Sequence, residues 1–158
     1  RRPSSTRTLL PPCGWHLNCT AHRFTMGGRE ALPTAAPNQA FEAFHGTSAQ
    51  NAEAIRRHGF RPSSGGCLGP GVYLAAERKA CRFAHDFHGS APALLRCSVR
   101  VANPKYVNSD CANWQAAGHD GCRAARTTRS TNPEWCIRGT DQISVLEVIS
   151  LAGRSRPA

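Results

Sequence analysis

Apolar and polar positions alternate over residues 40–44, Ala-Phe-Glu-Ala-Phe, a pattern typical of a half-buried strand. A helical pattern follows at once. Ser48 is a favourable N-cap and Gly59 a favourable C-cap, so the sequence predicts a helix between them. Ala52 and Ile55 would form its apolar stripe. A strand and a helix are therefore expected in direct succession.

The same succession is expected a second time, after a loop. Residues 61–70 are rich in Gly, Pro and Ser, which favour turns, and residues 71–75 then predict a second short strand. A helix over about 77–88 would place four apolar residues on one face: Ala80, Phe83, Ala84 and Phe87. Two strand ends beside a glycine-rich loop are typical of a ligand site.

The second half of the chain predicts three more strands. Residues 93–101 give the clearest pattern, residues 134–138 a shorter one, and residues 142–151 an apolar one that we expect near the centre of the sheet. The polar residues 103–133 are expected to form a long connection without regular structure, which in a small domain is often functional. This order of elements predicts an α+β fold with a largely antiparallel sheet.

A chain of 158 residues can bury the core of one domain. We expect an irregular N-terminal arm and packing segment over 1–39, the domain over 40–151 and a tail over 152–158. The sequence contains no run of 18 apolar residues and no recognisable signal peptide. We therefore expect a monomer in the cytoplasm or nucleus without a membrane partner, although the chain begins with Arg1 rather than Met and an upstream segment could precede it.

The net charge is +10 and the isoelectric point is near 9.9. This charge favours phosphate-rich or other anionic partners, but a solvated basic surface explains it equally well. Eight cysteines occur singly and none forms a CxxC pair, so reduced thiols are expected. Cys13, Cys19 and His22, with His16 between them, are the nearest approach to a zinc pattern. Their spacing is poor for zinc, and we expect no metal.

Three segments carry a family resemblance. They are residues 44–48 (Phe-His-Gly-Thr-Ser), residues 69–75 (Gly-Pro-Gly-Val-Tyr-Leu-Ala) and residues 132–137 (Asn-Pro-Glu-Trp-Cys-Ile). In this order, and over about 40–150, the chain resembles the poly(ADP-ribose) polymerase-like ADP-ribosyltransferases. The resemblance implies the ADP-ribosyltransferase fold, a mostly antiparallel split sheet with two short flanking helices.

The resemblance also implies a reaction and a site. The expected function is NAD-dependent mono-ADP-ribosylation of a protein or nucleic-acid acceptor, with NAD as co-substrate and nicotinamide as the leaving group. The family's His-Tyr-Glu triad would be His45, Tyr73 and Glu134, and Glu134 would stabilise the oxocarbenium-like transition state. The residues expected to bind NAD are His45, Gly46, Thr47, Gly71, Tyr73 and Phe83.

Two positions depart from the family pattern, and other interpretations stay open. Ala80 stands where the family usually has a serine that binds the nicotinamide carboxamide, and Phe83 stands where it usually has a tyrosine. The chain could instead be an inactive module that binds NAD or ADP-ribose, or a basic nucleic-acid-binding module. His119 and Asp120 either border the acceptor site or simply form a turn.

Overall fold

The computed structural model of the chain describes residues 32–158. Its elements, in chain order, are β1 (Ala40–Ser48), α1 (Ala49–His58), β2 (Val72–Ala75), α2 (Glu77–Phe87), β3 (Pro92–Arg100), β4 (Pro104–Val107), β5 (Gly121–Ala124), β6 (Glu134–Ile137), the 3-10 helix η1 (Thr140–Gln142) and β7 (Ile143–Ser150). Every strand pair in this part of the chain is antiparallel except β4–β5. The predicted α+β class with a largely antiparallel sheet is confirmed.

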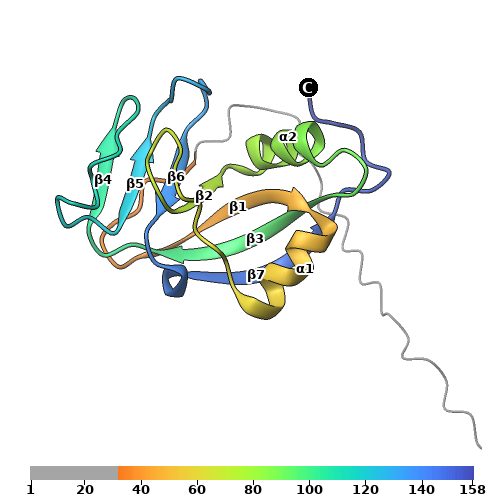
Figure 1. Cartoon of the computed structure of the whole chain (residues 1–158), viewed down its shortest axis with the longest axis horizontal. Helices are drawn as coiled ribbons and strands as arrows, with labels where there is room; N and C mark the ends of the chain where they lie inside the picture. Colours follow the sequence, from red (N-terminus) through yellow and green to blue (C-terminus); the bar gives the residue numbers. More distant parts are fainter. Residues whose placement is uncertain (1–31) are drawn as a thin grey trace, which may run out of the picture.

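All seven strands of residues 32–158 belong to one sheet, in the order β4-β5-β6-β2-β1-β3-β7 (Figure 1). β1 pairs with β3 along its whole length, whereas β1 and β2 are joined only at Phe44 and Ala75. The sheet therefore consists of two parts that meet at this single pair. We call β1, β3 and β7 the β3 half, and β2, β4, β5 and β6 the β6 half.

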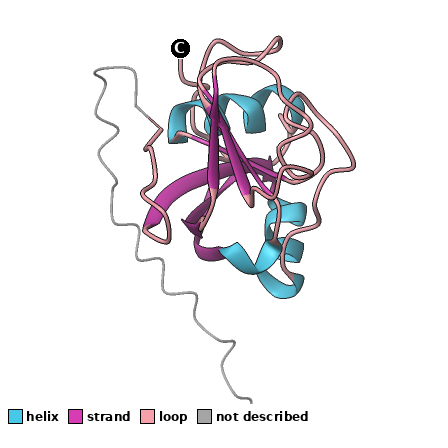
Figure 2. Cartoon of the chain, turned by 90° about the vertical axis from the view of Figure 1, so that its left-hand side faces the viewer, coloured by secondary structure: helices cyan, strands magenta, loops and turns pink. Residues whose placement is uncertain are grey.

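The two helices pack on opposite faces of the β3 half, with the strands between them in Figure 2. Successive residues of a strand point to opposite faces. Accordingly, Leu95 belongs to a core cluster with Ala52 of α1, whereas its neighbour Leu94 belongs to a second cluster with Ala80 and Ala84 of α2. A third cluster, centred on Trp114 and Cys136, fills the space beside the β6 half.

The caps of the first helix agree with the prediction. The Ser48 hydroxyl accepts a hydrogen bond from the Asn51 N–H at 3.2 Å, and the Gly59 N–H, at φ 80°, donates to the Ile55 carbonyl at 2.8 Å. β1 runs further than expected, because it continues from Phe44 to Ser48. The helix therefore begins directly at the end of the strand.

Two predictions about the sheet are wrong. Residues 103–133 are not without structure, because they contain β4 and β5 and so supply one end of the sheet. β7 does not lie near the sheet centre but forms its other edge, where Leu146 is 51% exposed. Its apolar residues indicated burial on both faces, but an edge strand pairs with one neighbour only, here β3, and Ile149 is only half-buried against the α2 cluster.

The apolar face predicted for α2 is also wrong in part. Ala80, Cys81 and Ala84 are buried, while Phe83 and Phe87 are 48% and 69% exposed. In a helix with 3.6 residues per turn, the two phenylalanines lie beside the stripe of small residues and not within it. The small residues let α2 approach the sheet closely, and the two rings remain at the edge of this contact.

Both ends of the described region pack on the domain. Residues 32–39 have no regular element, yet Leu32 is buried, and backbone carbonyls of this segment accept hydrogen bonds from the side chains of Arg123, Trp135 and Tyr106. At the other end, Arg156 pairs with Asp86 of α2 at 2.6 Å. No helix in residues 32–158 is long and apolar enough to cross a membrane.

Candidate functional site

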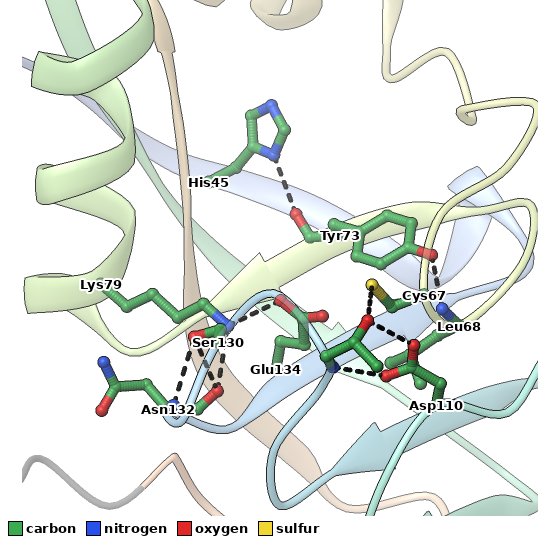
Figure 3. Close-up of polar contacts among 10 residues, drawn as sticks. His45, Cys67, Leu68, Tyr73, Lys79, Asp110, Ser130, Asn132 and Glu134 are labelled. Carbon is green, nitrogen blue, oxygen red and sulfur yellow. Dashed lines mark hydrogen bonds and ion pairs between the residues drawn. The ribbon is translucent and has the colours of Figure 1, made fainter.

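The candidate site lies where three neighbouring strands meet. β1, β2 and β6 are adjacent in the sheet, and the register sets Phe44 opposite Ala75 and Ala75 opposite Glu134. His45 follows Phe44 directly, and Tyr73 precedes Ala75 by two residues. The register therefore brings His45, Tyr73 and Glu134 to one part of the molecule, although they are far apart in the sequence (Figure 3).

His45 crosses the junction between the two halves of the sheet. Its Nδ1 lies 2.9 Å from the Tyr73 carbonyl oxygen, and its ring contacts Phe60 edge to face, with centroids 5.4 Å apart. A carbonyl can only accept a hydrogen bond, so Nδ1 carries the proton and Nε2 of the neutral ring is an acceptor. Burial lowers the pKa of His45. A neutral imidazole with one lone pair is therefore available to a ligand hydroxyl.

Glu134 is held by a lysine from α2. The Lys79 ammonium donates to Glu134 Oε2 at 2.6 Å and to the Asn132 carbonyl at 3.0 Å, and the two charged side chains are only 14% and 18% exposed (Figure 3). Two acceptors fix the position of the ammonium, which in turn orients the carboxylate. Glu134 Oε1 has no hydrogen-bond partner among the described residues. The carboxylate thus keeps one oxygen for a further contact.

Tyr73 anchors the glycine-rich loop at residues 61–71. Its hydroxyl accepts a hydrogen bond from the Leu68 N–H at 2.9 Å and donates to the Gly69 carbonyl at 2.7 Å. Burial is the main cause that raises the pKa of Tyr73. A Cβ at Gly66 would lie 2.3 Å from the tyrosine hydroxyl oxygen, so this loop crosses over the ring only because residue 66 is glycine.

A cleft of about 930 Å³ contains most of the predicted site residues. Its lining includes His45, Gly46, Gly71, Tyr73, Phe83 and Glu134. Thr47 was predicted to bind NAD as well, but it is buried and does not line the cleft. The side chains of successive strand residues alternate between faces, which separates Thr47 from the residue that precedes it.

Gly46 has a different steric role from the one its sequence position indicates. A Cβ there would lie 2.0 Å from the Ala80 carbonyl oxygen, so the missing side chain makes room for the backbone of α2. Ala80 itself is buried against the strand. Close packing of helix on strand therefore accounts for the glycine, and it also explains why a small residue stands at position 80.

The loop at residues 125–133 forms the wall of the cleft next to Glu134. Asp110 accepts hydrogen bonds from the Thr128 N–H at 2.8 Å and hydroxyl at 2.7 Å, which together lower the pKa of Asp110. The thiol of Cys67, on the glycine-rich loop, lies 3.6 Å from the Thr128 hydroxyl (Figure 3). The two loops that flank the cleft are thus in contact.

Sequence reasoning missed the roles of Lys79 and Asp110. Lys79 lies near the start of a helix that follows the strand with Tyr73, but no spacing links it to Glu134, which is 55 residues away. Asp110 falls in the segment that was expected to lack structure. Neither contact could be read from the chain, because both depend on how loops close over the sheet.

His119 and Asp120 follow the turn at residues 114–118 and do not line the cleft. The Asp120 carboxylate accepts hydrogen bonds from the Ala102 and Asn103 N–H groups, both at 2.8 Å, and from the Gln142 side chain at 3.1 Å. Asp120 therefore has a structural role in this structure, and a place for the pair beside an acceptor site stays a prediction.

Within residues 32–158, no group of three or more His, Cys, Asp or Glu side chains is placed to hold a metal ion. The Cys13, Cys19 and His22 pattern lies outside the described residues. All six cysteines of the described part are free thiols: Cys67, Cys81, Cys97, Cys111, Cys122 and Cys136.

No family model matches the sequence, and no curated protein matches it.

Proposed function

We propose that this chain is an NAD-dependent ADP-ribosyltransferase that moves one ADP-ribose from NAD to an acceptor and releases nicotinamide. One observation carries the proposal: His45, Tyr73 and Glu134, the set implied by the motif resemblance, come from three adjacent strands and line one cleft. The volume of about 930 Å³ suits a cofactor-sized ligand, since such sites usually measure about 300–1,000 Å³.

The residues of the cleft match the parts of NAD. The nicotinamide ring is cationic, and an aromatic face such as that of Tyr73 or Phe83 would contribute about 0.5–2 kcal/mol. β1 pairs with β2 only at Phe44, so the backbone beyond this residue has no partner strand on the β2 side. Gly46 would bind the carboxamide there, and His45 Nε2 would accept a hydrogen bond from a hydroxyl of the adenine-side ribose.

Glu134 would act on the bond that breaks. Loss of nicotinamide leaves positive charge on the ribose, as in glycoside hydrolysis, and a fixed carboxylate stabilises such charge. The free oxygen of Glu134 would accept a hydrogen bond from a hydroxyl of the same ribose. Lys79 acts as a positioning residue, because it holds the other carboxylate oxygen at 2.6 Å.

The test is the release of nicotinamide from labelled NAD by the wild type and by Glu134→Gln. This change keeps the size of the side chain and removes its charge, so we expect release to fall by about 100-fold or more. Glu147→Gln is the matched control, because Glu147 lies on β7, outside the cleft. The control should release nicotinamide at the wild-type rate.

Binding of NAD, measured by calorimetry, separates the remaining interpretations. If the wild type binds NAD but releases no nicotinamide with any acceptor, the chain is a binding module and the transferase proposal fails. If Glu134→Gln releases nicotinamide as fast as the wild type, the carboxylate is not the stabilising group and the proposed site is wrong.

A further inference from the structure

The wall of the cleft beside Glu134 has a fixed backbone. In the 125–133 loop, Thr127 and Ser130 exchange backbone hydrogen bonds at 2.7 and 3.2 Å, Asp110 binds Thr128, and Lys79 binds the Asn132 carbonyl. The loop ends directly at Glu134. Its side chains are therefore presented at a defined position next to the group that would act on NAD.

This fixed loop displays cations without carboxylate partners. Arg126 and Arg129 are exposed, and neither forms a hydrogen bond or ion pair with any residue in 32–158. The nearby carboxylates are already engaged, Asp110 by Thr128 and Glu134 by Lys79. Arg61, on the adjoining glycine-rich loop, also lines the cleft and has no ion pair in this region.

The part of the cleft lining that α2 supplies carries two exposed aromatic rings. Phe83 and Phe87 are one turn apart on α2, their centroids are 4.5 Å apart, and they are 48% and 69% exposed. Both line the cleft, with Arg82 beside them. If Phe83 stacks on nicotinamide, Phe87 remains as an aromatic surface that NAD binding does not use. The two adjoining rings form an exposed apolar patch beside the cleft, which makes this part of α2 a candidate interaction surface.

We propose that the outer part of this cleft binds single-stranded nucleic acid and presents it to the site as the acceptor, an inference that rests on the proposed transferase function. Unpaired arginines bind phosphates, and an exposed ring stacks on a base. Arg129 and Phe87, which line the cleft, and Arg126, which is exposed on the same loop just outside its lining, together supply both contacts. The net charge of +10 adds long-range attraction to a polyanion.

A single strand fits these features better than a duplex or a phosphopeptide. The bases of a duplex are stacked on one another, so they cannot reach a ring on a cleft wall. A phosphopeptide would satisfy the arginines but offers no base to Phe87. Only an unpaired strand combines a repeated phosphate with free aromatic faces.

The transfer step balances without a further reactant. A nucleophilic oxygen or nitrogen of the strand forms a bond to the ribose carbon that carried nicotinamide. The carbon–nitrogen bond to nicotinamide breaks, its electron pair stays on nicotinamide, and nicotinamide leaves as a neutral molecule. Any proton on the nucleophile passes to water.

Binding is tested without NAD, with a fluorescein-labelled oligothymidylate of about 20 nucleotides, a length that exceeds usual site sizes. The variants are Arg126→Gln/Arg129→Gln and Phe87→Leu. The control, Arg100→Gln/Arg138→Gln, removes the same charge from exposed positions outside both the cleft and the 125–133 loop. We expect about 10-fold weaker binding for the double arginine variant and for Phe87→Leu, and an almost unchanged dissociation constant for the control.

The salt dependence of the affinity and competition by other ligands test the proposed contacts further. The slope of log affinity against log salt should be less steep by about 1.4 in the double arginine variant, about 0.7 for each lost phosphate contact. Three outcomes would overturn the inference. The control could bind as weakly as the double arginine variant, the affinity could be independent of salt, or a duplex or a phosphopeptide could compete as well as the single strand.

Labelled NAD then distinguishes the two proposals. Label on the oligonucleotide, reduced in the double arginine variant, supports both. Nicotinamide release with label only on protein overturns the acceptor proposal and leaves the transferase. No release at all overturns the transferase and with it the acceptor role, while the binding experiment still reports on the surface itself.

Discussion

His45 is a half-buried histidine that lines the cleft, and only one of its ring nitrogens is hydrogen-bonded within residues 32–158. Nδ1 donates to the Tyr73 carbonyl, and the pKa of the ring is lowered, first by burial and to a lesser extent by the charge of His88. Protonation would place a charge where the surrounding protein replaces part of the water around the ring. His45 therefore binds a proton more weakly in the folded protein than in the unfolded chain.

This difference predicts a pH dependence of stability. The pKa of His45 is lower in the folded state than in the unfolded chain. The neutral ring therefore contributes its full stabilisation above about pH 6.5, and this stabilisation is lost as pH falls toward the pKa of the folded state. In urea unfolding, the free energy of unfolding of the wild type should decline as pH falls below about 6.5. In His45→Asn this decline should be less steep, by up to about 1.4 kcal/mol per pH unit. His58→Asn, at an exposed position on α1, is the control and should keep the wild-type slope. An unchanged slope in His45→Asn would contradict the assignment.

The sequence identified the candidate residues but not the contacts that hold them. His45, Tyr73 and Glu134 occur in short motifs, and motifs can be read directly. Lys79 could not be assigned to Glu134, because that contact depends on the position of α2 over the sheet. Thr47 was assigned to the ligand by its place in the motif, whereas the alternation of the strand buries it.

Helix α2 packs so closely against β1 at Gly46 that no side chain fits between them. At Gly46 the distance is so short that a Cβ would lie 2.0 Å from the Ala80 carbonyl oxygen and 3.1 Å from the Ala84 nitrogen. Both contacts are with backbone atoms, which cannot rotate away. Lys79 and Phe83 belong to the same helix, so this packing also places two residues of the cleft.

Gly46→Ala should therefore destabilise the protein. The helix would have to move away from the strand, which typically costs about 1–3 kcal/mol and sometimes more. Gly65→Ala is the matched control, because a Cβ there meets nothing within 4 Å and the backbone angle is not left-handed. Urea unfolding should show no loss for the control, or a gain of up to about 1 kcal/mol. Equal stability of Gly46→Ala and the wild type would show that α2 is not held at this distance.

Elements with a strong local pattern were predictable, and elements without one were not. α1 agrees with its predicted caps because Ser48 and Gly59 act on the adjacent backbone. β4 and β5 have only four residues each and are polar in part, so their pattern is too short to recognise. They exist because they pair with each other and with β6, which is information from distant residues.

The two halves of the sheet are also linked at the end opposite to the cleft loops. Asp120 precedes β5, in the β6 half, and its carboxylate binds the backbone that follows β3 and the side chain of Gln142 before β7. One side chain thus connects three segments that come from both halves. The sheet topology could not be read from the sequence, because such links join residues far apart in the chain.

Asp120→Ala should lower the free energy of unfolding by about 1–3 kcal/mol, because charge-assisted hydrogen bonds are lost. Nicotinamide release per folded molecule should not change, since Asp120 does not line the cleft. Asp141→Ala removes the same charge from an exposed position and should stay within about 0.5 kcal/mol of the wild type. If Asp120→Ala released less nicotinamide but was as stable as the wild type, the result would support the interpretation that Asp120 borders the acceptor site.

The single pair between β1 and β2 has a mechanical consequence. His45 belongs to one half of the sheet, and Tyr73 and Glu134 belong to the other, with only Phe44 and Ala75 in register between them. The sheet can therefore open with the fewest broken hydrogen bonds at the boundary between β1 and β2. A dinucleotide that contacts residues on both sides adds its binding free energy to the resistance against that opening. When such a ligand fills the cleft, the amide protons along the boundary between β1 and β2 would exchange with solvent more slowly. The ligand would thus join the two halves of the sheet where backbone pairing does not.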